Sequence, residues 1–578
     1  DQLQTYSATS IAYNITDNTT NILNATNSDL QGVSTAVTVD NTGTSETLSI
    51  ANIASINTKL GGSDPSYSTI NDTAATLGTD NTHAARMASK TIVITDNATA
   101  AQYRQALTNA GGATVSGAIV ETSSAALAAG ATLSNATSVV LKVQSSDKDF
   151  TSTSFQSEVT GFDLNGQTGV LFNIADVDGK TITDSAGGGN YIISDTYDVI
   201  KDADEDDGAG SPAATDAAKF IKLYGATEIQ VTDYDPTANT NAGDDLSIIG
   251  NTAANRDVVT NTAGIDSIAT TDIKITLSSD TTITDARGEK LTTVTKVDLS
   301  GTDTDLTIES DVLDGSTNEW SSLTTITGLG STNSLIITDV ADNANGFIDL
   351  YGISTLTSID GVTITGSTGV DIVNLSPALT ESGTTTIDLG SDTAADKIYF
   401  GISKNSLSST DTDNVLYTAV SNFSATNDRI GLYYYDYTDS PITAVNQTKR
   451  TGASGGTTTL SSDRSFIEED STTRFSALTG FDKVSEIQSV IAEGVGAFTS
   501  GANRLMFAHY TFDESASTNY AIINAADLTG ISTSSDLVET EDFKVIGIAT
   551  LAGVAEGALG TLGGFNLTAT KNSGLSGT

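Results

Sequence analysis

Short apolar stretches separated by small polar residues recur along the N-terminal quarter of the chain. Three related phrases begin at Tyr13, Tyr67 and Ala118, and each reads as a short strand that leads into a turn of small residues. Between the last two lies a β-branched segment, Thr91–Asp96, which is a further predicted strand. Residues 98–110 contain Ala, Gln and Leu but no Gly, and they predict a short helix. This part of the chain is therefore expected to alternate strands with short helices.

A second repeat occupies the middle of the chain. Related phrases begin at Leu291, Leu323 and Leu356, which lie 32 and 33 residues apart. Each phrase is followed by a second apolar segment, at residues 306–308, 335–337 and 371–373. Because strands this short are not stable alone, a fixed period of this kind indicates stacked coils.

The last part of the chain has a different character. Aromatic residues cluster in residues 432–437, and residues 483–495 place apolar side chains on one face of a predicted helix. Three further strands are predicted at Arg504–Phe507, Tyr520–Asn524 and Phe543–Ile548. The pattern predicts an α+β unit.

Together these patterns predict a mainly β protein with a repeat or β-solenoid architecture. The expected segments are N-terminal repeats of strands with short helices at residues 1–150, an acidic β domain with an Asp-rich loop at 151–244, a β-solenoid at 245–400 and a C-terminal α+β domain at 401–578. Pro212, Pro236 and Pro441 mark plausible boundaries.

The charge of the chain is one-sided. Its 578 residues include 72 Asp and Glu against 26 Lys and Arg, for a formal charge of −46, and 38% of the residues are hydrophobic. A chain with this net charge either expands because its charges repel one another or binds cations. Its hydrophobic fraction is too high for simple disorder, which favours a folded chain that binds cations. The absence of basic clusters argues against nucleic acid and against an anionic membrane surface as partners. The sequence contains no apolar stretch long enough to predict a membrane span. Because the chain has no Cys, it forms neither disulfides nor thiolate metal sites.

The carboxylates lie mostly beside Gly in turns that lead into predicted strands. Ca²⁺ takes about six to eight oxygen ligands, and Gly-rich turns let Asp side chains and backbone carbonyls converge on it. Degenerate turns of the calcium-binding β-roll type predict metal ligands at Asp244, Asp245, Asp266, Asp371, Asp392 and Asp396. The alternative is that Gly and Asp serve here as ordinary turn residues.

An Asp-rich loop gives a further candidate metal site. Its carboxylates are Asp202, Asp204, Asp206 and Asp207, and a smaller version of the pattern is formed by Asp176 and Asp178. The alternating Asp residues resemble the start of an EF-hand, but the twelfth position is Ala213, which cannot supply the required carboxylate. The loop is either a calcium site of another geometry or a solvated acidic loop.

Catalysis finds little support in the sequence. The two His residues, His83 and His509, lie in a polar loop and an aromatic strand, and no nucleophile elbow, zinc-protease or phosphate-loop motif is present. Paired carboxylates could hydrolyse glycosides, but a sugar cleft usually offers aromatic platforms and this chain has one Trp, Trp320. We therefore do not expect an enzyme.

A resemblance to a known family comes from residues 420–432. This segment is similar to the V-x-x-F-x-x-x-x-D-x-I-x-L sequence that follows the calcium repeats in large Gram-negative proteins exported by type I secretion. Residues 483–495, 501–507, 520–524 and 536–538 resemble the terminal domain of such adhesins and surface-layer proteins, and the phrase at Asp72 resembles one of their N-terminal repeats. The chain lacks perfect G-G-x-G-x-D tandems, which leaves the number of bound calcium ions open.

The resemblance implies a secreted, RTX-like protein of the cell surface that passes through the cell without calcium and folds outside, where several Ca²⁺ ions neutralise its carboxylates. Such export reads an uncleaved C-terminal signal, which agrees with a start at Asp1 that lacks a signal-peptide pattern. The expected function is structural: self-assembly into a surface layer or filament, with the chain itself as partner and a cell-surface polysaccharide as a candidate second partner. The alternatives are a calcium-dependent adhesin and an extracellular hydrolase of carbohydrates.

Overall fold

The computed structural model describes two compact units. Unit 1 comprises residues 1–195, 202–229 and 256–271, and unit 2 comprises residues 196–201, 230–255 and 272–578. Within them the structure describes residues 14–26, 36–39, 47–79, 81–128, 132–204, 225–234, 272–284, 291, 294–313, 320, 322–329, 332–338, 347–350, 352–376, 378–379, 385–402, 416–424, 426–434, 446–450, 465–469, 504–513, 518–527, 543–554 and 569–571. Strands predominate over helices, so the prediction of a mainly β protein is confirmed.

Unit 1 alternates strands with short helices. In chain order its elements are β1 (Asn14–Asp17), α1 (Thr19–Asn24), β2 (Ala36–Val39), β3 (Thr47–Leu48), α3 (Ile50–Lys59), β4 (Thr69–Asp72), α4 (Ala74–Leu77), α5 (Ala84–Met87), β5 (Thr91–Ile94), α6 (Ala100–Ala110), β6 (Val115–Glu121), α7 (Ser124–Leu127), β7 (Ala136–Lys142), β8 (Gly161–Asp163), β9 (Val170–Phe172), α8 (Ile174–Val177), β10 (Thr181–Thr183) and β11 (Tyr191–Asp195). Two more elements, α9 (Tyr197–Asp204) and β12 (Glu228–Val231), each contain a boundary between the units.

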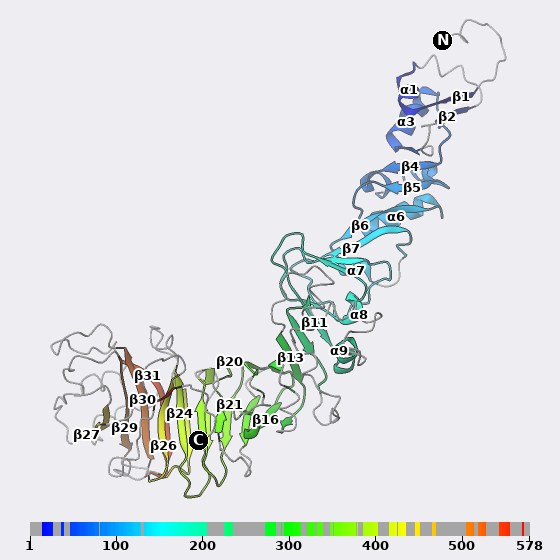
Figure 1. The fold of residues 1–578 in the computed structure, drawn as a ribbon. Helices are drawn as coiled ribbons and strands as arrows, with labels where there is room; N and C mark the ends of the chain where they lie inside the picture. Colours follow the sequence, from blue (N-terminus) through cyan, green and yellow to red (C-terminus); the bar gives the residue numbers. More distant parts are fainter. Residues whose placement is uncertain are drawn as a thin grey trace, which may run out of the picture. The chain divides into compact units, whose positions relative to one another are not determined.

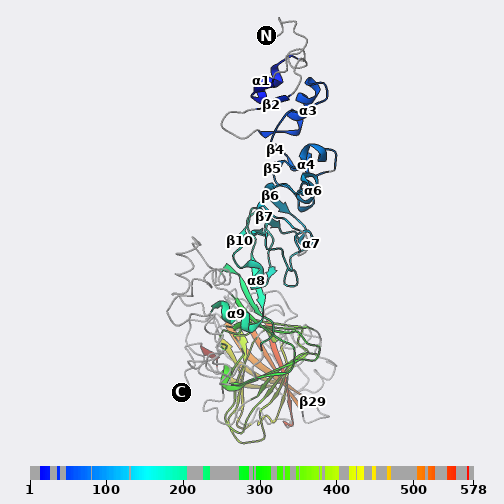
Figure 2. The same cartoon turned by 90° about the vertical axis from the view of Figure 1, so that its right-hand side faces the viewer.

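The main sheet of unit 1 follows the chain. Its order is β10-β8-β7-β6-β5-β4-β3, and all of its neighbouring strands are parallel. Strands β3 to β7 start 22, 22, 24 and 21 residues apart. Figure 2 shows α4, α6 and α7 on one side of β4–β7, where α6 contacts β6 and both neighbouring helices. The expected alternation of strands with short helices is therefore present in unit 1.

Helix α6 shows why these segments start and stop where they do. Thr99 and Gln102 form a reciprocal capping box at its start, and Gly111 ends it in the left-handed conformation, with φ 61°. The predicted strand at Thr91–Asp96 and the predicted helix at residues 98–110 are confirmed as β5 and α6. The predicted turns of small residues differ: after β4 and β6 the chain makes the single-turn helices α4 and α7. Thr73 caps the first of them through its side chain, whereas Ser123 before α7 makes no such bond.

The described part of unit 2 consists mainly of strands. In chain order they are β13 (Asp272–Leu277), β14 (Thr281–Ile283), β15 (Val294–Leu299), β16 (Asp305–Glu309), β17 (Thr325–Gly328), β18 (Ser334–Thr338), β19 (Phe347–Asp349), β20 (Thr355–Thr357), β21 (Gly361–Thr365), β22 (Ile372–Leu375), β23 (Thr385–Asp388), β24 (Lys397–Ile402), β25 (Leu416–Ser421), β26 (Arg429–Tyr434), β27 (Asn446–Arg450), β28 (Ser465–Glu469), β29 (Arg504–Asp513), β30 (Thr518–Asp527), β31 (Phe543–Ala552) and β32 (Ala569–Lys571). A 3-10 helix, η3 (Ser310–Leu313), follows β16.

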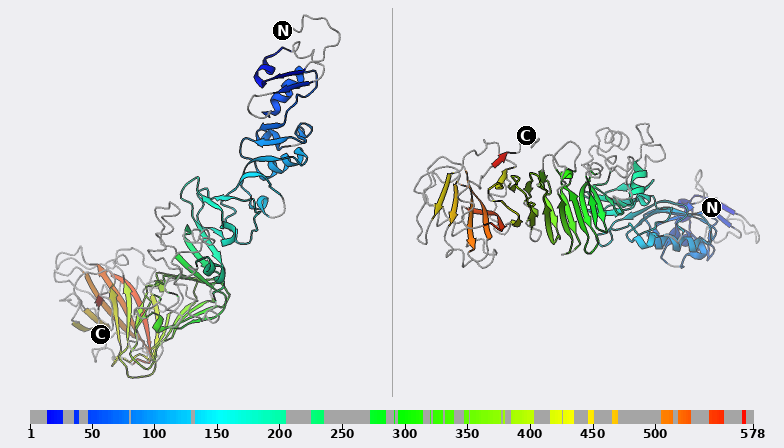
Figure 3. Two further views of the ribbon diagram at one scale, coloured as in Figure 1. Left: turned by 45° about the vertical axis from the view of Figure 1, so that its right-hand side comes forward. Right: turned by 90° about the horizontal axis from the view of Figure 1, so that it is seen from below.

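Three sets of strands organise unit 2. An 11-stranded sheet has the order β14-β16-β18-β21-β23-β25-β31-β30-β29-β28-β27, a five-stranded sheet has the order β19-β22-β24-β26-β32, and β13, β15, β17 and β20 pair in chain order. Figure 1 shows β24 and β26 near β29–β31, and the right-hand view of Figure 3 shows a row of strands standing side by side. Pairing is parallel except where β30 runs antiparallel to β29 and β31.

The core of unit 2 consists of equivalent positions on successive strands. Five isoleucines pair in register from β14 to β23 and are fully buried: Ile283, Ile308, Ile337, Ile364 and Ile387. Val420 continues the row on β25 and is buried as well. Because strand side chains alternate between faces, each strand adds one buried residue to this row.

The predicted alignment of the middle repeat was wrong by three residues. Val297 pairs with Ile326 and Ile326 pairs with Leu356, so these strands recur after 29 and 30 residues, in place of the expected 32 and 33. The residue equivalent to Leu291 is Trp320: each accepts, through its carbonyl, a bond from the backbone N–H three residues later. The predicted alignment matched Leu with Leu, so it paired Leu291 with Leu323 and missed the equivalent Trp320.

The third follow-on strand was also misassigned. Asp371 immediately precedes β22, and residues 372–373 belong to that strand. β22 pairs with β19 and β24 in the five-stranded sheet. The strand that pairs with β18 in the 11-stranded sheet is β21. Both are short segments that contain β-branched apolar residues, so the sequence pattern does not distinguish them.

The predicted C-terminal strands are confirmed, within the longer strands β29, β30 and β31. They join the 11-stranded sheet, because β31 pairs in parallel with β25. The predicted helix at residues 483–495 lies outside the described residues.

Candidate functional site: carboxylates between neighbouring strands

Carboxylates in unit 1 connect four of the described helices to a later strand. In each case an acidic residue at the end of that strand, or just after it, accepts the backbone N–H of the first residue of the helix. The bonds run from Ile50 N to Asp72 Oδ2 (2.9 Å), Ala74 N to Asp96 Oδ1 (2.6 Å), Ala100 N to Glu121 Oε2 (2.9 Å) and Ile174 N to Asp195 Oδ2 (3.0 Å).

These bonds satisfy groups that a helix cannot satisfy by itself. The first N–H groups of a helix lack internal partners and carry a partial positive charge, so a carboxylate there is stabilising. Asp72 uses both of its oxygens: one accepts Ile50 N and the other accepts Thr73 N, its own chain neighbour. Asp17 occupies the same place at the end of β1, and among the described residues its bonds go to Asn18 and Asn21, on its own segment.

We expect Asp72→Ala to loosen α3, because Ile50 N then loses its acceptor at a cost of about 1–3 kcal/mol. Hydrogen exchange of the α3 amides, read by mass spectrometry, should become faster by roughly tenfold or more, at about 1.4 kcal/mol per factor of ten. Asp17→Ala is the matched control, since within the part of the chain that the structure describes it removes only bonds to its own segment. Equal effects of the two variants on α3 would contradict this role.

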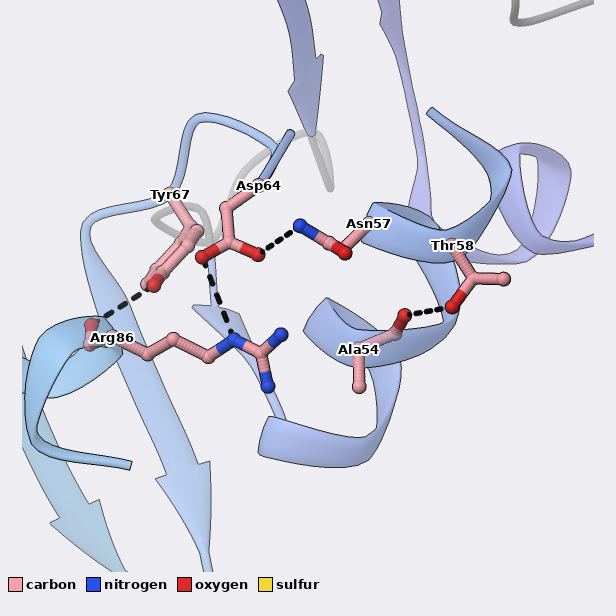
Figure 4. A network of polar contacts seen from close by, with 6 residues as sticks. All are labelled: Ala54, Asn57, Thr58, Asp64, Tyr67 and Arg86. Atoms are coloured by element: carbon pink, nitrogen blue, oxygen red, sulfur yellow. Dashed lines mark hydrogen bonds and ion pairs between the residues drawn. The ribbon is translucent and has the colours of Figure 1, made fainter. Parts of the chain in front are cut away.

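A polar group in the same unit involves one of its few basic side chains. Figure 4 shows Asp64 accepting from Asn57 Nδ2 at 2.9 Å and from Arg86 Nε at 3.4 Å. The Tyr67 hydroxyl donates to the Arg86 carbonyl at 2.9 Å. Burial raises the pKa of Tyr67, the Asp64 carboxylate raises it further and Arg86 opposes the change. The group joins α3 to α5 by conventional bonds and suggests no reactive site.

Unit 2 contains a second row of carboxylates, at the starts of strands in the five-stranded sheet. Asp371, Asp396 and Asp428 immediately precede β22, β24 and β26 and are almost fully buried, at 0, 2 and 1% exposure. Asp396 Oδ1 accepts Asp371 N at 2.9 Å, and Asp428 Oδ1 accepts Asp396 N at 3.1 Å. Asp396 and Asp428 therefore each bond to the backbone just before the neighbouring strand of the sheet, whereas the carboxylates of unit 1 bond to the first residues of helices.

The second oxygens of this row bond within their own turns. Asp371 Oδ2 accepts Ser367 N at 3.1 Å, and Asp428 Oδ2 accepts Ser424 N at 2.6 Å. The turn after β23 adds Asp392, whose Oδ1 accepts Ala394 N at 2.6 Å while its Oδ2 is buried without a hydrogen-bond partner. Four carboxylates thus gather at this edge of the sheet, and one of their oxygens is unsatisfied.

The electrostatics of the row follow from burial and repulsion. Burial raises the pKa of Asp396 to about 6; the Asp428 and Asp392 carboxylates also raise it, against the hydrogen bond from Asp371. Burial likewise raises the pKa of Asp428, with a further contribution from Asp392. The charged forms of these groups are therefore disfavoured in the folded chain, and either a proton or a cation relieves them.

The residues of this row fit a hard cation in chemistry. Ca²⁺ prefers carboxylate and carbonyl oxygens, and the buried Asp392 Oδ2 is an oxygen whose hydrogen bonding is incomplete. The side chains as they stand do not form a preassembled cage: in the part of the chain that the structure describes, no three His, Asp or Glu residues meet in a group that could hold a metal ion. A bound cation would accordingly need a rearrangement of the turns.

The predicted ligands in the remaining segments separate into three groups. Asp176 is buried in α8 whereas Asp178, just after it, is exposed, so this pair does not face one site. Asp202 and Asp204 lie in α9, and nothing is described of their side chains. Asp206, Asp207, Asp244, Asp245 and Asp266 lie outside the described residues.

The carboxylate of Asp176 is affected by a second carboxylate, that of Asp195. Asp176 Oδ2 is buried without a hydrogen bond, and burial raises the pKa of Asp176 to about 6, with a further rise from the Asp195 carboxylate. Asp195 lies at the end of β11 and caps Ile174 at the start of the same helix. The two acids come together because neighbouring strands are in register.

The sequence patterns did not indicate Asp72, Asp96, Glu121, Asp195 or Asp428 as functional residues. A usable signal was present for the first three: an acidic residue at or just after the end of a β-branched strand, followed shortly by Thr or Ser and an Ala-rich turn. Asp428 lies in the segment that carries the family resemblance, between the buried residues Phe423 and Ile430.

Comparisons with protein-family models, with curated proteins and with solved structures gave no match. Among the described residues no helix is long and apolar enough to cross a membrane.

Proposed function

We propose that this chain is a structural, secreted protein of the cell surface that assembles with its own copies into a surface layer or filament, stabilised by calcium. The observation that carries the proposal is the parallel pairing of strands in rising chain order from β3 to β8 and from β14 to β25, with carboxylates that bond from one strand segment to the segment before it. In such a chain each repeated strand and its connection contacts mainly its neighbours, and this regular architecture suits a load-bearing subunit.

We further propose that the stacked strands are coils of a β-solenoid. Support comes from the in-register row of buried isoleucines from β14 to β23 and from strand spacings of 29 and 30 residues at β15, β17 and β20. In a solenoid every coil repeats the same positions, so one residue type recurs at each buried point.

Calcium enters the proposal through the acidic row of Asp371, Asp392, Asp396 and Asp428. Three of these side chains are buried, and burial together with repulsion from neighbouring carboxylates raises the pKa of Asp396 and Asp428. A divalent cation bound by Asp392, Asp396 and Asp428 would neutralise the row and satisfy the unpaired Asp392 Oδ2. Because Asp396 and Asp428 immediately precede two neighbouring strands and Asp392 lies in the turn before the first of them, the ion would couple metal binding to folding of unit 2.

The test is to remove calcium with a chelator from the purified chain and to image it by negative-stain electron microscopy before and after calcium is restored. We expect ordered arrays or filaments that dissolve on chelation and re-form with calcium but not with an equal concentration of magnesium, which needs a more rigid octahedral site. Asp392→Asn is the matched variant and should raise the calcium concentration needed for assembly. A chain that stays monomeric at every calcium concentration contradicts the proposal, and glycan binding by that monomer would favour an adhesin.

A further inference from the structure

The 11-stranded sheet of unit 2 ends in two edge strands. Its terminal members are β14 and β27, and among the strands that the structure describes neither has a partner on its outer side. The inner partners are β16 and β28, both parallel. An edge strand presents backbone N–H and C=O groups that can pair with a strand of another molecule.

The two edges point in the same direction. β27, β28 and β29 are mutually parallel, β30 is antiparallel to its neighbours, and β31 is parallel to β25. The remaining pairs from β25 back to β14 are parallel as well. A copy of β14 placed beside β27 would therefore extend the sheet by a parallel pair, which is the pairing already used at both edges.

The outermost strands at the two edges differ in charge. β27 contains Lys449 and Arg450 and no acid, and the sequence from residue 440 to residue 462 has no acidic residue. On its inner side the basic pair lies in register with Glu468 and Glu469 of β28, so its charge is free to act outward only in part. β14 is flanked in sequence by Asp280 and Asp285. Since each molecule has a formal charge of −46, two copies repel unless a basic segment of one meets an acidic segment of the other.

We infer that β27 of one molecule pairs in parallel with β14 of a second copy, so that the sheet continues from molecule to molecule. The contact uses two different surfaces, so each subunit can bind two others, and repetition of the contact produces a chain of subunits. This inference rests on the proposed assembly function and names one interface for it.

The absence of Cys from the chain allows a direct test. Thr282→Cys in β14, where Thr282 is exposed, and Thr448→Cys in β27 are prepared as separate full-length variants, one with an affinity tag. They are mixed in calcium and treated with a short bis-maleimide. We expect a covalent dimer that contains one copy of each variant, and none when Thr448→Cys is replaced by the exposed control Ser152→Cys.

The outcomes separate this inference from the proposed function. Dimers of Thr448→Cys with itself would indicate a symmetric contact and overturn the inference. Arrays without the mixed dimer would overturn it as well and leave assembly standing, whereas monomers without the dimer would contradict both. Reversal of the basic pair by Lys449→Glu and Arg450→Glu should raise the concentration needed for assembly by about tenfold, because like charges would then meet at the edge. An unchanged assembly concentration would also overturn the inference.

Discussion

Replacement of Trp320 by Ala is expected to destabilise unit 2 by about 3–5 kcal/mol, the usual cost of removing a buried aromatic side chain. Trp320 is 1% exposed, and its Nε1 donates to the Val294 carbonyl at 2.8 Å. It fills the position that Leu291 and Leu350 fill on the neighbouring strand connections, and both of those residues are fully buried. The substitution would therefore leave a cavity between consecutive strands together with a carbonyl that has lost one donor.

Urea unfolding followed by circular dichroism measures this effect, because the variant lacks the chain's one Trp and its fluorescence. Trp320→Phe keeps most of the volume and should cost less than Trp320→Ala. Leu329→Ala is the matched control: Leu329 is 64% exposed, so its loss should change the unfolding free energy by no more than about 0.5 kcal/mol. If Trp320→Ala behaves like Leu329→Ala, the proposed stacking around Trp320 is incorrect.

The second large effect concerns pH. Burial and the neighbouring carboxylates raise the pKa of Asp396 to about 6, above its ordinary value of 3.8. Between these values the folded chain binds more protons than the unfolded chain, so the proton's contribution to stability is complete below 3.8 and is lost as pH rises toward 6. In calcium-free buffer this group alone should lower the unfolding free energy over that window by up to roughly 3 kcal/mol.

The measurement compares the parent chain with Asp396→Asn, which cannot titrate but keeps an oxygen to accept Asp371 N. The difference between their unfolding free energies should change from about pH 4 to pH 6, and the variant should be the more stable of the two at pH 7 without calcium. Asp178→Asn, at an exposed position in the other unit, is the control. A difference that stays constant across the window would show that Asp396 is ionised throughout. With calcium present the parent chain should gain stability at pH 7 and the variant should gain less.

The positions of the carboxylates show that only some of the acidic residues support cation binding. The imbalance of 72 acidic over 26 basic residues suggested that cations must be held. In unit 1, however, Asp72, Asp96 and Glu121 bond to backbone N–H groups of the preceding helices, so they have a structural use that needs no metal. The case for a cation is concentrated at Asp392, Asp396 and Asp428, where burial and repulsion act together.

The sequence by itself determined the local elements. β-branched alternation located β5, β15 and the C-terminal strands, and the Ala-rich run with its Thr99 cap located α6, because these signals depend on residues close together in the chain. Register was decided only by the tertiary structure. The alignment of Trp320 with Leu291 and the meeting of Asp396 with Asp428 join residues 29 and 32 positions apart, and both depend on which strands lie side by side. A two-residue period specifies which face a side chain occupies but not which neighbour it meets, so the rows of core residues and carboxylates appear only after the strands have stacked.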